Sequence, residues 1–139
     1  MRYTLSLTDT QYDALTMHLF RAPTEMAAYL LCRFSVTGDE TRLLVREVIP
    51  VEAPDVISSS GHHMQIRSNS FLRAMKRAHL SKQGFVFVHS HPPDFPEHSP
   101  QDDSEEQKLF ETAHIRIDGA PVHASLVFSS PHHPVGRVW

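Results

Sequence analysis

The chain has 139 residues, of which 40% are hydrophobic and 21% are charged, and its formal net charge is -3. A chain of this length corresponds to one ordinary domain and buries roughly two-thirds of its unfolded surface, so it needs no disulfide to form a core. The near-balanced charge gives no electrostatic reason to expect nucleic acid or an anionic membrane as a partner. The single cysteine, Cys32, leaves no pair for an intramolecular disulfide. We therefore expect one domain over residues 1–139.

No targeting segment is predicted. Residues 1–7 alternate between polar and apolar side chains and do not form the continuous apolar run of a signal peptide. No apolar stretch approaches the roughly 20 residues of a membrane-spanning helix. The predicted location is the cytoplasm. Eleven histidines are an unusual number for this length, but only their positions can indicate whether any of them binds a metal.

The N-terminal half alternates between strand and helix patterns. Thr8 and Gln11 have the spacing of a capping box at the start of a helix, and this helix must end before Pro23. Two largely apolar stretches follow, separated by a turn around Gly38, and they predict a buried strand and its antiparallel partner. The predicted elements are strands at residues 2–8, 25–35 and 42–51 and a helix at residues 9–20.

The C-terminal half contains the clearest helix and the most apolar strand. Phe71, Leu72, Met75 and Ala78 form an apolar stripe at helical spacing, and four consecutive β-prone residues after Gly84 indicate a strand covered on both faces. The order of elements predicts an α/β (α+β) domain with a single mixed sheet flanked by helices. The predicted elements are short strands at residues 62–66 and 135–139, strands at 85–88 and 122–128, and helices at 69–82 and 100–112, with residues 51–57 irregular.

The chemistry is concentrated after the apolar strand. His89 and His91 are two residues apart at the end of this strand, so their side chains point to the same side and can reach one metal ion. Asp102 lies near the start of the next helix, where its carboxylate can face back over the loop. Two nitrogens and one carboxylate oxygen form a known catalytic zinc set with the fourth position open, whereas a closed structural site usually needs cysteine.

A His-x-His pair alone often occurs by chance, but here it belongs to a longer pattern. The sequence has His-x-His-Pro at His89, His91 and Pro92, then six residues, then Ser-x-x-Asp at Ser99 and Asp102. This pattern resembles the signature of the JAB/MPN family of zinc metalloproteases, also called JAMM proteases, and the resemblance covers essentially the whole chain. It implies an MPN-type core, similar to that of cytidine deaminases, and one zinc ion per chain.

The resemblance also implies a glutamate upstream that acts as the general base. Glu25, at the start of an apolar strand, matches this residue, although alanines stand where the family often has a glycine. Glu47 on the next strand is the competing candidate. Ser99 is the implied donor to the oxyanion that develops on the substrate, and its alternative role is to cap the helix that begins at Pro100.

Other polar residues near the motif receive simpler interpretations. The loop residues Asp94, Glu97 and His98 are expected to lie beside the site and to contact substrate. Asp103 is expected to be a solvated acid in the first helical turn. The pairs at residues 62–63 and 132–133 are interpreted as surface histidines because neither has an evident third ligand.

The family resemblance implies a zinc-dependent peptidase or isopeptidase that removes or matures a ubiquitin-like protein, similar to a deubiquitinase. Short prokaryotic members are similar to proteins encoded beside E1-like and E2-like partners, some of them in antiphage defence. Two alternatives remain at this stage, a non-catalytic MPN-type binding module and a metallopeptidase that acts on small peptides. A nucleobase deaminase is excluded because its zinc site requires more than the single cysteine present.

Overall fold

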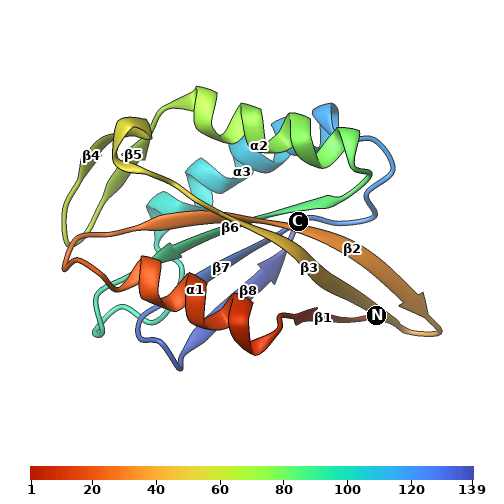
Figure 1. Ribbon diagram of the computed structural model, residues 1–139, viewed down its shortest axis with the longest axis horizontal. Coiled ribbons are helices and arrows are strands. Elements are labelled where there is room, and N and C mark those ends of the chain that lie inside the picture. Colours follow the sequence, from red (N-terminus) through yellow and green to blue (C-terminus); the bar gives the residue numbers. More distant parts are fainter.

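A computed structural model describes residues 1–139 and has three layers, with a sheet between helices (Figure 1). The strand order in the six-stranded sheet is β1-β3-β2-β6-β7-β8. The predicted class, a mixed sheet flanked by helices, is confirmed. The strands of this sheet are β1 (Arg2–Ser6), β2 (Ala27–Thr37), β3 (Glu40–Pro50), β6 (Gly84–Ser90), β7 (Ala124–Phe128) and β8 (Pro134–Val138). The helices are α1 (Asp9–Leu19), α2 (Ser68–Leu80) and α3 (Pro100–Arg116).

The sheet is mixed because β1 pairs with β3 and β6 pairs with β7 in parallel, while the other neighbours are antiparallel. The parallel pair β6 and β7 is connected through α3, which lies on one face of the sheet (Figure 1). Such a crossover brings the carboxyl end of the first strand next to the start of the helix, which is a common position for a ligand site. The predicted metal ligands fall on these two segments.

Helix α1 covers one face of the sheet. Thr8 and Gln11 form the predicted capping box, in which Thr8 Oγ1 accepts from the backbone N–H of Gln11 and the Gln11 side chain accepts from that of Thr8. Leu15 and Leu19 are fully buried against the apolar side chains of β2 and β6. Cys32 belongs to the same cluster and is a small core residue, as its apolar surroundings in the sequence indicate.

Helices α2 and α3 cover the opposite face. The stripe predicted on α2 is buried at Met75 and Ala78, and Phe110 of α3 belongs to the same cluster and packs against Phe85 of the sheet. Tyr29 and Phe85 form the sheet side of this cluster, with ring centroids 5.3 Å apart. Because β2 and β6 have apolar residues on both faces, these central strands are continuous apolar runs in the sequence.

The region between β3 and α2 differs from the prediction. Residues 51–57 were expected to be irregular, but they include a single 3-10 turn (Ala53–Asp55) and the beginning of a strand, β4 (Val56–Ser59). This strand pairs only with β5 (Met64–Ile66), and the two form a small separate sheet. Smaller differences concern element ends, since β2 begins at Ala27, not at residue 25, and α3 continues to Arg116, beyond residue 112. None of the helices is long and apolar enough to cross a membrane.

Candidate metal centre

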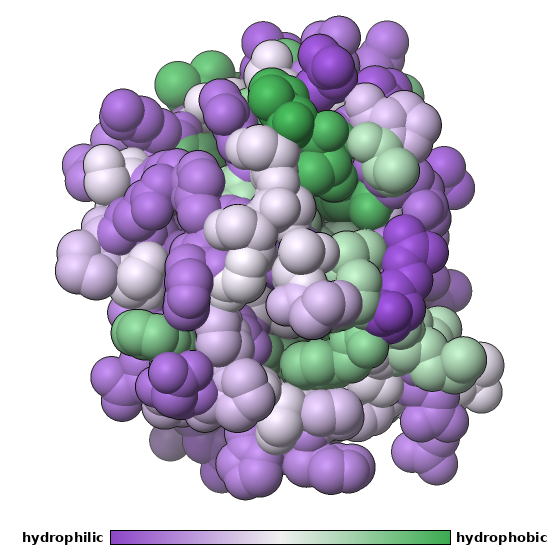
Figure 2. All heavy atoms as spheres, turned by 90° about the vertical axis from the view of Figure 1, so that its left-hand side faces the viewer, coloured by the Kyte–Doolittle hydropathy of each residue, from purple (hydrophilic) through white to green (hydrophobic).

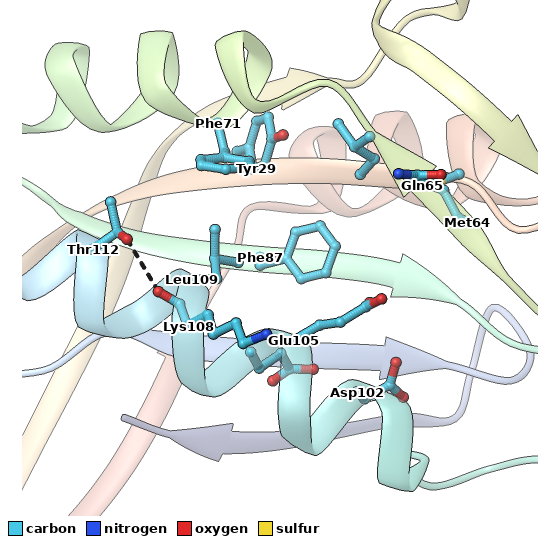
Figure 3. A pocket seen from close by; sticks show the side chains of 12 residues that line it. Tyr29, Met64, Gln65, Phe71, Phe87, Asp102, Glu105, Lys108, Leu109 and Thr112 are labelled. Atoms are coloured by element: carbon cyan, nitrogen blue, oxygen red, sulfur yellow. Dashed lines mark hydrogen bonds between the residues drawn. The ribbon is translucent and has the colours of Figure 1, made fainter.

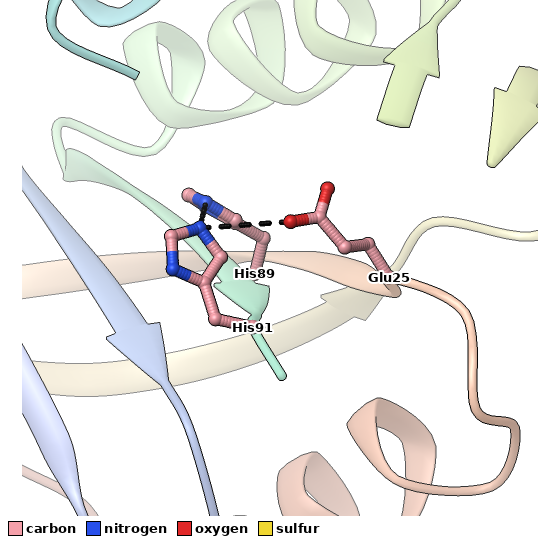
Figure 4. A group of neighbouring side chains, drawn as sticks. All are labelled: Glu25, His89 and His91. Atoms are coloured by element: carbon pink, nitrogen blue, oxygen red, sulfur yellow. Dashed lines mark hydrogen bonds and ion pairs between the residues drawn. The ribbon is translucent and has the colours of Figure 1, made fainter. Parts of the chain in front are cut away.

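His89 and His91 reach the same point from the end of β6. His89 is the penultimate residue of β6, and His91 is the first residue after the strand. Their Nε2 atoms are 2.9 Å apart (Figure 4). Ser90 faces the other way, where its Oγ accepts from the backbone N–H of Met26 at 3.0 Å. The alternation expected at a strand end therefore brings the two imidazoles together, and both residues are buried.

Asp102 completes the group from the start of α3. Its Oδ1 lies 3.2 Å from His89 Nε2 and its Oδ2 lies 3.1 Å from His91 Nε2. A capping box holds the carboxylate in place, because Asp102 Oδ2 accepts from the backbone N–H of Ser99 at 2.7 Å while Ser99 Oγ accepts from that of Asp102 at 3.1 Å. The structure therefore brings together the three side chains that the sequence pattern predicts as ligands.

A backbone contact selects the tautomer of His91. The Nδ1 atom of His91 lies 3.1 Å from the carbonyl oxygen of Phe95 in the following loop. A carbonyl only accepts, so the ring donates its proton there and keeps the lone pair on Nε2. That lone pair faces Asp102 and His89.

Glu25 lies beside this group, immediately before β2. Its Oε1 is 3.6 Å from His91 Nε2, and only 6% of the residue is exposed (Figure 4). Its backbone is fixed on both sides, since its N–H donates to the Ser60 carbonyl at 2.8 Å and its carbonyl accepts from Ser59 Oγ at 2.6 Å. Burial raises the pKa of Glu25, and this effect is partly offset by His89 and His91.

The competing glutamate is not part of this site. Glu47 lies on β3 and forms an ion pair of 2.7 Å with Arg77 of α2, in a position open to solvent. Glu25 is the carboxylate that the fold brings to the two histidines, and it closes a group with His89 and His91 in which donor atoms lie within 4.8 Å of one another.

Burial and neighbouring groups have opposite effects on the pKa values of Asp102 and His91. Burial alone would raise the pKa of Asp102, but hydrogen bonds with His89 and His91 outweigh it and hold the pKa well below its ordinary value. Burial would lower the pKa of His91, but Asp102 and Glu25 outweigh it and raise the pKa. The carboxylates of Asp102 and Glu25 thus favour a positive charge beside His91.

These observations fit a divalent metal ion such as zinc. In a tetrahedral zinc site each donor lies about 2.0–2.1 Å from the ion, so donors are roughly 3.3–3.4 Å from each other. The two ring nitrogens lie 2.9 Å apart, and each has one Asp102 oxygen at a similar distance, Oδ1 at 3.2 Å from His89 and Oδ2 at 3.1 Å from His91. The carboxylate of Asp102 and the lone pair on His91 Nε2 are acceptors only, and a cation is the group that satisfies several converging acceptors.

An apolar cleft of about 300 Å³ lies between β5 and α3 and reaches Asp102 of the candidate site (Figure 3). Tyr29, Phe71, Phe87 and Leu109 line its base and sides, and Asp102 lies at one end. The side of the molecule that lies to the left in Figure 1 is mostly polar, and its most strongly hydrophobic side chains gather above the centre of the view (Figure 2). The site therefore has an apolar approach from one side.

A second hollow of about 450 Å³ adjoins the site on its other side. Glu25 and His91 are among its lining residues, as are Pro23, Pro92 and Pro131. The candidate metal ligands thus adjoin both hollows, Asp102 the first and His91 the second.

Neighbouring residues follow their sequence-based interpretation only in part. His62 and His63, interpreted as surface histidines, also line the small hollow that contains Glu25, His89, Ser99 and Asp102, and His62 is exposed. Their approach depends on the turn between β4 and β5, which the sequence pattern did not reveal. His98, expected to face substrate, has a buried side chain with Nε2 3.1 Å from Ser125 Oγ. Asp103 is a solvated acid in the first turn of α3, as expected, and its exposed carboxylate also pairs with Arg137 of β8.

The comparison with known families agrees with this geometry. The chain matches the model of the prokaryotic homologues of the JAB domain over residues 9–138. It belongs to this family. None of the curated proteins matches this JAB-domain chain. Among solved structures, its fold is similar to the solution structure of protein DSY2949 from Desulfitobacterium hafniense, with a TM-score of 0.58 and 25% identity over 98% of this chain and 82% of that one. The chain thus combines a JAB-domain fold with side chains, among them Glu25, His89 and His91, that could hold a metal ion.

Proposed function

We propose that this JAB-domain protein is a zinc-dependent peptidase or isopeptidase that removes or matures a ubiquitin-like protein. The observation that carries the proposal is the convergence of His89, His91 and Asp102, with Glu25 beside them, next to two hollows of the surface. A binding module has no need of these four side chains in this arrangement. The resemblance of the whole motif to catalytic JAMM proteases supports the same conclusion.

In this proposal His89 Nε2, His91 Nε2 and a carboxylate oxygen of Asp102 hold the zinc ion. When bound, zinc supplies a Lewis acid that lowers the pKa of a water molecule and polarises the substrate carbonyl. The loop carbonyl of Phe95 keeps the proton of His91 on Nδ1, so that Nε2 stays available. The Ser99 backbone N–H fixes the direction of the Asp102 carboxylate.

Glu25 acts as the general base and then as the general acid. Its carboxylate takes a proton from the attacking water and delivers it to the nitrogen of the leaving amine. Burial raises its pKa towards the range in which a carboxyl group can do both. The backbone N–H and carbonyl of Glu25 are bonded to Ser60 and Ser59. These bonds fix the position of the residue beside the ligands.

Ser99 can cap α3 and serve the reaction at the same time. Its Oγ accepts the backbone N–H of Asp102 through a lone pair, and a hydroxyl still has its own proton to donate. Ser99 lines the small hollow with Glu25 and His89. We therefore assign its O–H to the oxyanion that develops on the substrate carbonyl.

The shape of the approach supports the proposed substrate class. The strand β5 pairs only with β4, so its other edge is free to receive an extended peptide. Met64 and Ile66 of β5 line the apolar cleft, which can take alternate side chains of such a peptide. An extended C-terminal tail of a ubiquitin-like protein has this form, and the hollow next to Glu25 would then receive the amine side. Association with E1-like and E2-like proteins remains a prediction.

The first test measures the metal. The protein is purified without a histidine tag and its zinc content is determined by elemental analysis, together with the His89→Ala and Asp102→Ala variants. We expect about one zinc ion per chain in the wild type and a loss of zinc in both variants. A zinc-free wild type that stays folded and takes up no added zinc would overturn the mechanism and favour the binding module.

The second test measures cleavage. Ubiquitin-like proteins with a C-terminal fusion and with a lysine-linked target are offered to the zinc-loaded protein, with Glu25→Gln as the inactive control. Cleavage after the ubiquitin-like tail supports the proposal and distinguishes a linear bond from an isopeptide bond. Cleavage of short free peptides alone would favour the small-peptide metallopeptidase.

A further inference from the structure

Glu106 is a buried carboxylate that the mechanism above does not use. It lies on α3 one turn after Asp102, and only 2% of it is exposed. A buried charge is costly unless other groups compensate for it. The contacts of its two oxygens therefore indicate what this residue does.

The first oxygen, Oε1, is partnered by the C-terminal segment. It accepts from Arg137 Nε at 3.3 Å and from Trp139 Nε1 at 3.2 Å. The guanidinium group of Arg137 lies 5.1 Å from the ring centroid of Trp139 and also pairs with Asp103. These contacts hold the carboxylate in one orientation.

The second oxygen, Oε2, is buried and has no hydrogen-bond partner. His98 Nε2 is 3.8 Å away from it, but this nitrogen already contacts the hydroxyl of Ser125 at 3.1 Å. A carboxylate oxygen of Glu106 also lies within 4.8 Å of a ring nitrogen of His89 and of Asp102. An unused acceptor is thus present at the back of the metal ligands.

His89 has a buried ring nitrogen that also lacks a hydrogen-bond partner. Its Nε2 faces His91 and Asp102, while its Nδ1 is buried and has no hydrogen-bond partner. The Phe87 ring stacks on the imidazole, with centroids 5.2 Å apart. A neutral imidazole that offers its Nε2 lone pair to a metal carries its proton on Nδ1, and a buried N–H group of this kind normally has an acceptor.

We propose that Glu106 is a positioning residue that accepts the Nδ1 proton of His89, directly or through one water molecule, and thereby holds His89 Nε2 towards the metal. The inference rests on the zinc site of the proposed function. It extends the support of the site to β8, because Arg137 and Trp139 hold Glu106 in place. His91 uses a loop carbonyl for the same purpose, so each histidine has its own second partner.

The Glu106→Gln variant separates this role from a merely structural one. The oxygen of the glutamine can still accept from Arg137 and Trp139, which preserves the attachment of β8. Its NH2 group is then on the side of His89, where it cannot accept a proton. Asp103→Asn is the matched control, because it removes the other carboxylate that contacts Arg137, on the same helix and away from His89.

Two measurements test the proposal. The zinc dissociation constant is obtained by competition with a chromogenic chelator, and the Nδ1–H signal of His89 is followed by nitrogen-15 NMR of the zinc-loaded proteins. For Glu106→Gln we expect zinc binding about 10–100-fold weaker and an upfield shift of the His89 signal, with the thermal unfolding of the zinc-free protein nearly unchanged. Asp103→Asn should leave both zinc affinity and the His89 signal as in the wild type.

The inference fails if Glu106→Gln binds zinc as tightly as the wild type, or if Asp103→Asn weakens binding to the same extent. In both cases the wild type still binds zinc, and the proposed function stands. A wild type without zinc would remove the basis of both.

Discussion

Ser99 and Asp102 cap the first turn of α3 reciprocally, each side chain accepting from the other's backbone N–H, at 3.1 and 2.7 Å. The same Asp102 carboxylate contacts both histidines of the site. The start of the helix and the orientation of a metal ligand are therefore set by one local motif. This coupling explains why a serine three residues before the aspartate belongs to the pattern.

Replacing Ser99 with glycine separates the cap from the hydroxyl. Glycine is a tolerable N-cap residue, so Ser99→Gly should lower the free energy of unfolding by only a few tenths of a kcal/mol. If the hydroxyl donates to the oxyanion, kcat should fall about 100-fold or more. Chemical denaturation and steady-state kinetics on the same preparations check both expectations. An active Ser99→Gly enzyme with normal kcat would leave Ser99 only its capping role.

Removing the carboxylate of Glu25 should stop catalysis without releasing zinc. The isosteric variant Glu25→Gln keeps the buried shape but cannot take up a proton, so kcat should fall roughly 10²–10⁴-fold. Zinc content by elemental analysis should stay near the wild-type value, because the proposed ligands are elsewhere. Loss of zinc in this variant would instead make Glu25 a fourth ligand.

Glu47 offers the matched control for Glu25. It is also a glutamate next to the apolar strands, but it is ion-paired with Arg77 and about a third of its side chain is exposed. Glu47→Gln should therefore leave kcat, KM and zinc content unchanged, and the loss of a solvent-exposed ion pair should cost at most about 1 kcal/mol of stability. A large drop in kcat for this variant would make Glu47, and not Glu25, the general base.

The ligand residues could be predicted from the sequence because their geometry is local. His89 and His91 are adjacent on one face of a strand end, and Asp102 follows in the first turn of the next helix, so short-range periodicity already brings them together. Glu25 needed the family resemblance, since only the pairing of β2 with β6 places it beside the histidines. Glu106 was missed because its partners, Arg137 and Trp139, are more than 30 residues away and meet it only through the packing of β8.

In the fold, too, the elements with strong local signals could be predicted, whereas those defined by tertiary pairing could not. The capping box of Thr8, the stripe on α2 and the apolar run of β6 are strong local signals, and all three elements are present. The short strand β4 contains Ser58 and Ser59 and lacks a clear alternation of buried residues. It is defined by pairing with β5, a tertiary interaction that composition does not encode. This hairpin brings His62 and His63 to the site, so their position could not be predicted either.

A charge in the apolar cleft should block the substrate but not the metal. Leu109 lines the cleft from α3, and Leu109→Arg would occupy its apolar wall with a long cationic side chain. We expect KM for a ubiquitin-like fusion to rise at least tenfold while zinc content is retained. The control is Ile115→Arg on the same helix, because Ile115 is 80% exposed and away from the cleft. Equal effects of the two variants would contradict a role of the cleft in substrate binding.

Acid should destabilise the protein through histidines that are buried without charge. His123 is fully buried, and its Nδ1 accepts from the backbone N–H of Phe85 at 3.0 Å. Burial, reinforced by nearby His114, lowers the pKa of His123 from 6.5 to about 4. Between these pH values the unfolded chain binds a proton that the folded chain does not. The free energy of unfolding therefore has its full value above pH 6.5 and decreases as the pH is lowered from 6.5 towards 4.

The contribution of His123 to this loss is up to about 3 kcal/mol. The His123→Asn variant can still accept the N–H of Phe85 but has no proton to gain, so its unfolding free energy should depend less steeply on pH. The comparison uses denaturant unfolding of the zinc-free proteins at several pH values from 4 to 7, because metal release would add its own pH dependence. His98, whose pKa burial also lowers to about 4, should leave a residual slope in the variant. Identical slopes for His123→Asn and the wild type would show that His123 does not titrate across this range.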